Sequence, residues 1–165
     1  MKKVMVGFLV AGFLAGGHGA FAEGKGLPVE YSLSLGAQSN ARGDSPFSLL
    51  MLSLDARAGI RVLNWLEISP EVMAVADDNL RFAFVWVYPG ALVNLRLGDF
   101  FVGAGAILPI VFMEGGSATG SIVTKANVGY RRGRLILTVF AMSSTEEGFS
   151  PLAFDWVGAT VGVRF

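Results

Sequence analysis

The chain has 165 residues, 53% of them hydrophobic and 16% charged, with 13 basic and 13 acidic side chains and no cysteine. Equal numbers of opposite charges exclude the basic surface of a nucleic-acid-binding protein, so we expect no nucleic-acid partner. Without cysteine, the chain has no disulfide framework, no thiolate metal site and no cysteine nucleophile. Its length predicts a single domain.

The first 22 residues have the pattern of a secretory signal peptide. Lys2 and Lys3 form a basic start, an apolar stretch follows over 4–17, and Ala20-Phe21-Ala22 gives a small-x-small cleavage pattern. A transmembrane anchor, the alternative, would need roughly 20 apolar residues. We therefore expect residues 1–22 to be cleaved as a signal peptide and residues 23–165 to form one exported domain.

Apolar residues in the rest of the chain recur at every second position, which is typical of membrane-spanning strands. Between Leu50 and Ile60 the even positions are leucine, alanine or isoleucine, whereas most odd positions are polar. The uncharged stretch Phe100–Met113 is too short for a spanning helix and contains two glycines and a proline. The sequence therefore predicts an all-β fold.

Eight such segments are predicted, and an even number is what closed exported barrels require. They are Leu27–Ala37, Leu50–Ile60, Leu66–Ala76, Phe82–Leu97, Phe101–Met113, Ser121–Arg131, Leu135–Met142 and Leu152–Phe165. Three connections are tight (63–65, 98–99 and 132–133) and four are longer (38–45, 77–81, 114–120 and 143–151). We predict an eight-stranded antiparallel up-and-down transmembrane β-barrel, with its short turns and both termini on the periplasmic side.

In this architecture the chain resembles the small eight-stranded outer-membrane β-barrels of Gram-negative bacteria, a family that includes the OmpA transmembrane domain, OmpX and OmpW. The most specific feature is the last strand, where Val161, Val163 and the terminal Phe165 alternate like the signal recognised by the barrel-assembly machinery. The resemblance implies outer-membrane lipid, lipopolysaccharide and that machinery as partners, and we expect a monomer. The predicted outer loops look shorter than the protruding strands of OmpX-like adhesion proteins.

Aromatic residues support this orientation, because Trp65, Phe100, Tyr130 and Phe165 all fall at the predicted periplasmic strand ends. An aromatic girdle belongs at that interface. The alternative interpretation is that these are ordinary turn aromatics of a soluble β protein.

The inward face is expected to carry a charge network of Glu30, Asp55, Arg57, Arg61, Glu67, Glu71, Arg96, Lys125 and Arg164. Charges inside a narrow barrel must be paired or hydrated. We interpret them as structural ion pairs, with a proton or ion path as the alternative. Because side chains fill the interior of an eight-stranded barrel, we expect no constitutive pore.

The outer half of the interior is predicted to be a hydrophobic lumen formed by Phe82, Phe84, Trp86, Tyr88, Phe140, Met142, Phe154 and Trp156, alongside Met51, Met73 and Val75. Such a chamber could hold a lipid tail or a small hydrophobic ligand, as the resemblance to OmpW-like barrels implies. A β-bulge near Pro89 and Gly90 would instead turn the aromatics of the fourth segment toward lipid.

We expect no enzymatic activity, no cofactor and no bound metal. Outer-membrane enzymes that resemble this fold use a catalytic histidine, and the only histidine, His18, lies in the leader. The main hypothesis is a structural or envelope-interaction role, and the alternative is a carrier or gated conduit for small hydrophobic molecules. A third, a soluble lipocalin-like barrel, conflicts with the apolar outer face of 50–60.

The predicted outer loops are acidic and contain one known tripeptide. Their acids are Asp44, Asp77, Asp78, Glu114, Glu146 and Glu147. Divalent cations could bridge this rim to lipopolysaccharide phosphates. Arg42-Gly43-Asp44 spells an integrin-type motif, which we interpret as a chance match.

Overall fold

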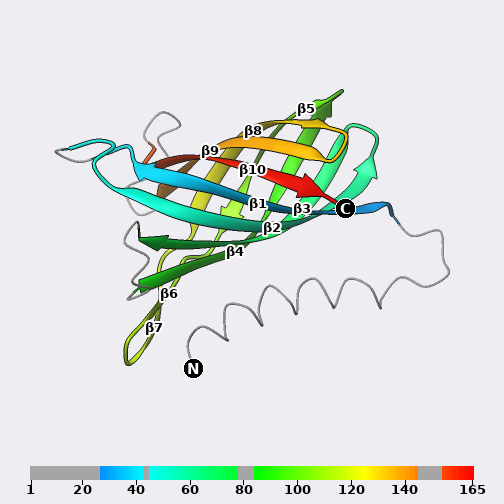
Figure 1. Ribbon diagram of the computed structural model, residues 1–165. Coiled ribbons are helices and arrows are strands. Elements are labelled where there is room, and N and C mark those ends of the chain that lie inside the picture. Colours follow the sequence, from blue (N-terminus) through cyan, green and yellow to red (C-terminus); the bar gives the residue numbers. More distant parts are fainter. Residues whose placement is uncertain (1–26, 43–44, 78–83, 145–153) are drawn as a thin grey trace.

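The computed structural model describes residues 27–42, 45–77, 84–144 and 154–165. All regular structure in these residues is β-strand (Figure 1). The strands are β1 (Val29–Asn40), β2 (Leu50–Leu63), β3 (Leu66–Asp77), β4 (Phe84–Leu97), β5 (Phe100–Ile107), β6 (Ile110–Met113), β7 (Gly116–Thr119), β8 (Val123–Arg132), β9 (Leu135–Ser144) and β10 (Trp156–Arg164). Within these ranges there is no helix long and apolar enough to cross a membrane.

Eight of these strands form a closed antiparallel barrel, as the sequence predicts. Its wall runs in the order β1, β2, β3, β4, β5, β8, β9 and β10, and β10 pairs again with β1. The hairpin of β6 and β7 continues from β5 and extends beyond the wall, where β6 pairs with the outer end of β4 (Figure 1). Closure satisfies the backbone groups on both sides of every wall strand.

The strands are strongly staggered around the barrel. A row of paired residues starts at Met51 on β2, passes round all eight wall strands, and returns to β2 at Arg61, ten residues further along. This stagger tilts the strands against the barrel axis. An eight-stranded barrel of this kind has an interior only wide enough for its own side chains.

The two faces of the wall differ sharply in polarity. On β2 the apolar Leu50, Leu52 and Leu54 point outward, whereas Ser53 and Asp55 are buried inside. The same alternation holds on the other wall strands, where Leu35, Val93, Val128 and Val139 are exposed on the outside. The period-two alternation predicted for 50–60 is therefore confirmed.

Strand β4 is regular where a β-bulge was the alternative. Its pairing with β3 runs without a shift from Leu66↔Leu95 to Ala76↔Val85. Trp86 and Tyr88 therefore stay on the inner face, opposite Val75 and Met73. The bulge that would have turned them toward lipid does not form.

The third predicted loop is mostly strand. Residues 114–120 were expected to be loop, but Gly116–Thr119 forms β7, and the tight turn is Glu114-Gly115, with a φ of 96° at Gly115. At this connection the structure has a protruding hairpin, where the sequence analysis predicted a loop shorter than the protruding strands of OmpX-like proteins. Strands β1 and β9 likewise run on to Asn40 and Ser144, into predicted loops, because their pairing with β10 and β8 continues there.

Glycines let large side chains lie flat against the inner wall. A Cβ added at Gly129 would lie 2.2 Å from the Phe101 ring, and one added at Gly158 would lie 2.4 Å from the Phe140 ring. Each ring therefore occupies the space that a neighbouring side chain would need. Each glycine, paired with a large residue on the adjacent strand, thus leaves room for the ring inside the barrel.

Candidate functional site

The interior contains two layers of ion pairs, and the first lies at mid-height. Arg57 lies 2.9 Å from Asp55 and 3.1 Å from Glu71, and the other Glu71 oxygen lies 2.7 Å from the Lys125 ammonium. The four side chains come from β2, β3 and β8 and are almost completely buried. Two positive and two negative charges make this layer neutral, as a low-dielectric interior requires.

The second layer lies nearer the short turns. Arg131 donates two hydrogen bonds to the Glu67 carboxylate, at 2.6 and 2.8 Å. Arg164 lies 2.6 Å from Glu30, and Arg96 lies 3.9 Å from Glu67. The fork-to-fork geometry of Arg131 and Glu67 is the strongest form of an arginine-carboxylate pair.

The predicted charge network is thus largely brought together, with one absence and one addition. Arg61 faces the interior but forms no ion pair with any described residue. Arg131 was not predicted, although the inward parity of Lys125 and Asn127 on the same strand indicates its position. The predicted turn at 132–133 placed Arg131 at the very end of its strand. In the structure the turn is Gly133-Arg134, so the strand continues past Arg131.

An apolar cluster fills the interior beyond the mid-height layer. Its buried members are Met51, Met73, Val75, Tyr88, Ile107, Phe140 and Met142, with Trp86, Val123 and Trp156 packed against them. The Lys125 ammonium lies 4.8 Å from the centre of the Phe140 ring and 3.9 Å from the Met73 sulfur. The apolar cluster therefore rests directly on the charged layer.

Of the eight residues predicted to form the hydrophobic lumen, five belong to this cluster, two do not, and one lies outside the described residues. Trp86, Tyr88, Phe140, Met142 and Trp156 are members. Phe84 is 53% exposed, because β4 extends beyond the ring there and pairs only with the protruding hairpin. Phe154 precedes β10 and lies outside the cluster, and Phe82 lies outside the described residues.

A buried amide lies beside the cluster without a partner. Gln38 on β1 is 1% exposed and is paired with Met51 and Gly158 on the neighbouring strands. Neither its amide oxygen nor its amide nitrogen has a hydrogen-bond partner. Buried polar groups in proteins are nearly always hydrogen-bonded, so this one is a candidate for contact with something other than the barrel wall.

At the end of the barrel opposite the short turns, Asp155 links the segment that follows β1 to the end of β9. Its carboxylate lies 3.2 Å from the Arg42 guanidinium and accepts a 2.6 Å hydrogen bond from the Ser144 amide. Arg42 of the predicted tripeptide is therefore engaged within the chain. Gly43, Asp44, Asp78, Glu146 and Glu147 lie outside the described residues.

The aromatic residues predicted for the periplasmic girdle lie on the outside, at the end of the barrel with the short turns. Trp65, Phe100 and Phe165 are exposed, and Phe100 packs against Tyr130 with ring centres 5.0 Å apart. Among the described residues there is no group of three or more histidine, cysteine, aspartate or glutamate side chains that could hold a metal ion.

Comparisons with known proteins concern the fold. No protein-family model matches the chain, and no curated protein is significantly similar in sequence. A designed transmembrane β-barrel is similar with a TM-score of 0.50 and 12% identity, over 87% of this chain and 98% of that chain. Neisserial surface protein A gives 0.48 and 18% identity over 82% and 94%, and the attachment invasion locus protein Ail of Yersinia pestis gives 0.45 and 12% over 85% and 99%. The designed barrel shares the fold predicted from the sequence.

Proposed function

We propose that this chain is an outer-membrane β-barrel protein with a structural or envelope-interaction role and no catalytic activity. The observation that carries the proposal is the inverted polarity of the closed wall. Leu35 is 65% exposed on the outside, whereas Glu71 and Lys125 are buried inside. An apolar exterior is unfavourable in water at about 25 cal/mol per Å² but costs nothing in hydrocarbon, and a closed barrel leaves no backbone group unpaired in lipid.

The proposed orientation places the short turns in the periplasm. The aromatic residues at that end then lie at the membrane interface, and the protruding hairpin and Asp155 face outward toward lipopolysaccharide. Val161, Val163 and Phe165 point to the outside of the last strand, where the barrel-assembly machinery could recognise them. Residues 1–22 are proposed to direct export and to be cleaved.

Electrophoretic mobility tests the proposal. The protein is extracted from the membrane fraction with detergent, and boiled and unboiled samples are compared. A closed barrel with this pairing is expected to stay folded in the unboiled sample and to migrate differently after boiling, because unfolding requires rupture of the whole ring. A protein found in the soluble fraction with no mobility shift would contradict the proposal and favour the lipocalin-like alternative.

A second candidate function is a carrier for small hydrophobic molecules. The unpartnered amide of Gln38 beside the aromatic and methionine cluster favours it, because a ligand with an apolar tail and a polar head would satisfy both. The close packing of the cluster means that a ligand would have to displace side chains such as Phe140 and Met142, which are only 2% and 1% exposed.

Tryptophan quenching distinguishes the carrier from the structural role. In a Trp65→Ala variant only Trp86 and Trp156 remain, and a carrier should show saturable quenching by 12-bromododecanoic acid. The matched Trp86→Ala/Trp156→Ala variant keeps Trp65 alone, outside the lumen, and should show only gradual quenching. If the two variants behave alike, the carrier hypothesis is wrong.

A further inference from the structure

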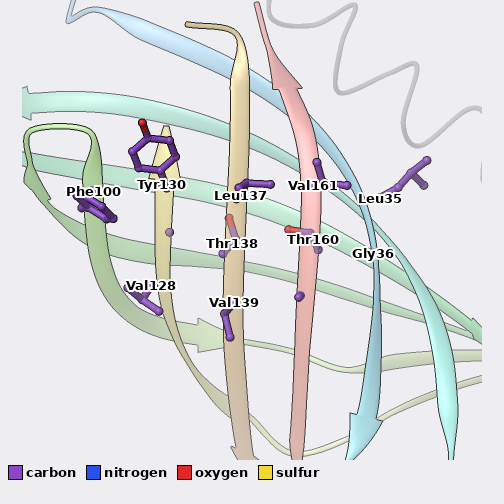
Figure 2. Close-up of a pocket in the computed structure, with 12 residues that line it drawn as sticks. Leu35, Gly36, Phe100, Val128, Tyr130, Leu137, Thr138, Val139, Thr160 and Val161 are labelled. Atoms are coloured by element: carbon purple, nitrogen blue, oxygen red, sulfur yellow. The ribbon is translucent and has the colours of Figure 1, made fainter. Parts of the chain in front are cut away.

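A concave apolar surface lies on the outside of the barrel, away from the interior layers. It has a volume of about 530 Å³ and spans β5, β8, β9, β10 and β1. Figure 2 shows Phe100, Tyr130, Leu137, Val161 and Leu35 in a row across these five strands. We call this surface the outer groove.

The groove arises where a row of large side chains runs beside a row of smaller ones. The second row pairs Val128 with Val139, then Val139 with Ala159, and then Ala159 with Ala37. On β10 and β1 this row consists of Ala159 and Ala37, whose side chains are single methyl groups. The outer surface is therefore hollow beside Leu35 and Val161. The groove is therefore a fixed feature of the strand register and needs no movement to form.

Two unpaired cations lie at the turn end of the groove. Arg132 follows the groove residue Tyr130 on the same outward face, about 7 Å along the strand, and Arg134 lies in the next turn. Both are exposed, and neither forms an ion pair within the described part of the chain. Among the described residues, the acids at this end are Asp99, Glu30, which is paired with Arg164, and Glu67, which is paired with Arg131.

We propose that the outer groove binds one anionic phospholipid, with an acyl chain along the apolar floor and the phosphate at Arg132 and Arg134. The proposal rests on the membrane location proposed above. The groove volume lies in the range of small-ligand sites, about 300–1,000 Å³, and its cations complement a phosphate. Lipopolysaccharide is excluded as the occupant because, in the proposed orientation, it faces the opposite end of the barrel.

Native mass spectrometry of the purified barrel tests this assignment. The protein is mixed with equal amounts of dioleoyl phosphatidylglycerol and dioleoyl phosphatidylcholine, and the retained lipid is counted. We expect one phosphatidylglycerol to be retained about 30-fold more tightly, since each of the two arginines at a membrane surface contributes about 1 kcal/mol toward anionic lipid. Arg132→Gln/Arg134→Gln should lose this preference and keep the acyl-chain binding.

A matched pair of filling variants tests the groove itself. Ala159→Phe should abolish retention of both lipids, whereas Ala74→Phe, on the outer face of β3 across the barrel, should leave it unchanged. Equal retention in the two variants, or the same lipid preference with and without the two arginines, would overturn the inference. A wild-type dimer that Ala159→Phe disperses would identify a second copy as the occupant and overturn it too.

The mobility shift on boiling distinguishes failure of the phospholipid site from failure of the proposed membrane function. Every variant is first required to show the shift, which demonstrates a closed barrel. A wild-type protein that shows no shift would remove the membrane proposal. A barrel that shifts on boiling and yet retains no preferred lipid would remove only the phospholipid site.

Discussion

At the scale of single residues, the pair of Glu67 and Arg131 shows how charge is tolerated inside the wall. Each carboxylate oxygen accepts one guanidinium hydrogen bond, and the guanidinium stacks 4.4 Å from the centre of the Phe101 ring. Ser69 donates a further hydrogen bond of 2.9 Å to Glu67. The charged groups thus exchange hydration for several directed contacts, which is the condition under which a buried ion pair is tolerated.

Glu67→Gln is expected to destabilise the barrel by about 3 kcal/mol, because it removes the carboxylate that accepts both guanidinium hydrogen bonds and leaves the buried Arg131 charge with only Glu30, 3.7 Å away. A Glu67→Gln/Arg131→Met double variant should recover part of that loss, since both charges are then removed. Arg42→Gln breaks the more exposed pair with Asp155 and should cost less than about 1 kcal/mol. Urea unfolding followed by tryptophan fluorescence measures all three, and an equal loss in Glu67→Gln and Arg42→Gln would contradict the prediction.

Residue-level prediction succeeded where parity alone decides the facing of a side chain. Asp55 and Glu71 could be placed inside because their segments alternate without interruption. Arg131 was missed because a shift of one residue in the turn moved it from the predicted strand end to a paired interior position. Which cation meets which carboxylate depends on the stagger around the ring, which no local pattern contains.

At the scale of elements, local composition failed where pairing decides the structure. The residues of β7 are Gly-Ser-Ala-Thr, which resemble a loop, yet they pair with β6 because that strand runs on past the last contact between β5 and β8. Leu108 and Pro109 separate β5 from β6, as expected because proline has no N–H group to donate to the hydrogen-bond ladder. Pro89 leaves the register of β4 unbroken, so a proline and a glycine side by side do not by themselves predict a bulge.

At the scale of the whole molecule, the ring and the hairpin make different contributions to stability. The ring closes through β1 and β10, which are distant in sequence, and loss of that pair would expose two strand edges to lipid. The hairpin pairs with the ring on one side only, through β6 and residues 84–87 of β4, and Ile107 and Val123 already pair directly beneath it. Closure is therefore a property of the eight wall strands alone.

Two deletions of ten residues each test this division. Removal of residues 110–119 takes out the hairpin and leaves a short connection between the paired ends of β5 and β8, so the refolded barrel should keep its boiling-dependent mobility. Removal of residues 156–165 takes out β10 and leaves one edge of β1 and one edge of β9 without a partner strand, so the protein should refold without the shift and be digested by trypsin in lipid vesicles. Refolding from urea in vitro removes any influence of the assembly machinery. A truncated chain that still shifts on boiling would show that the barrel closes without β10, and loss of the shift in the hairpin deletion would show that the hairpin is part of the stable ring.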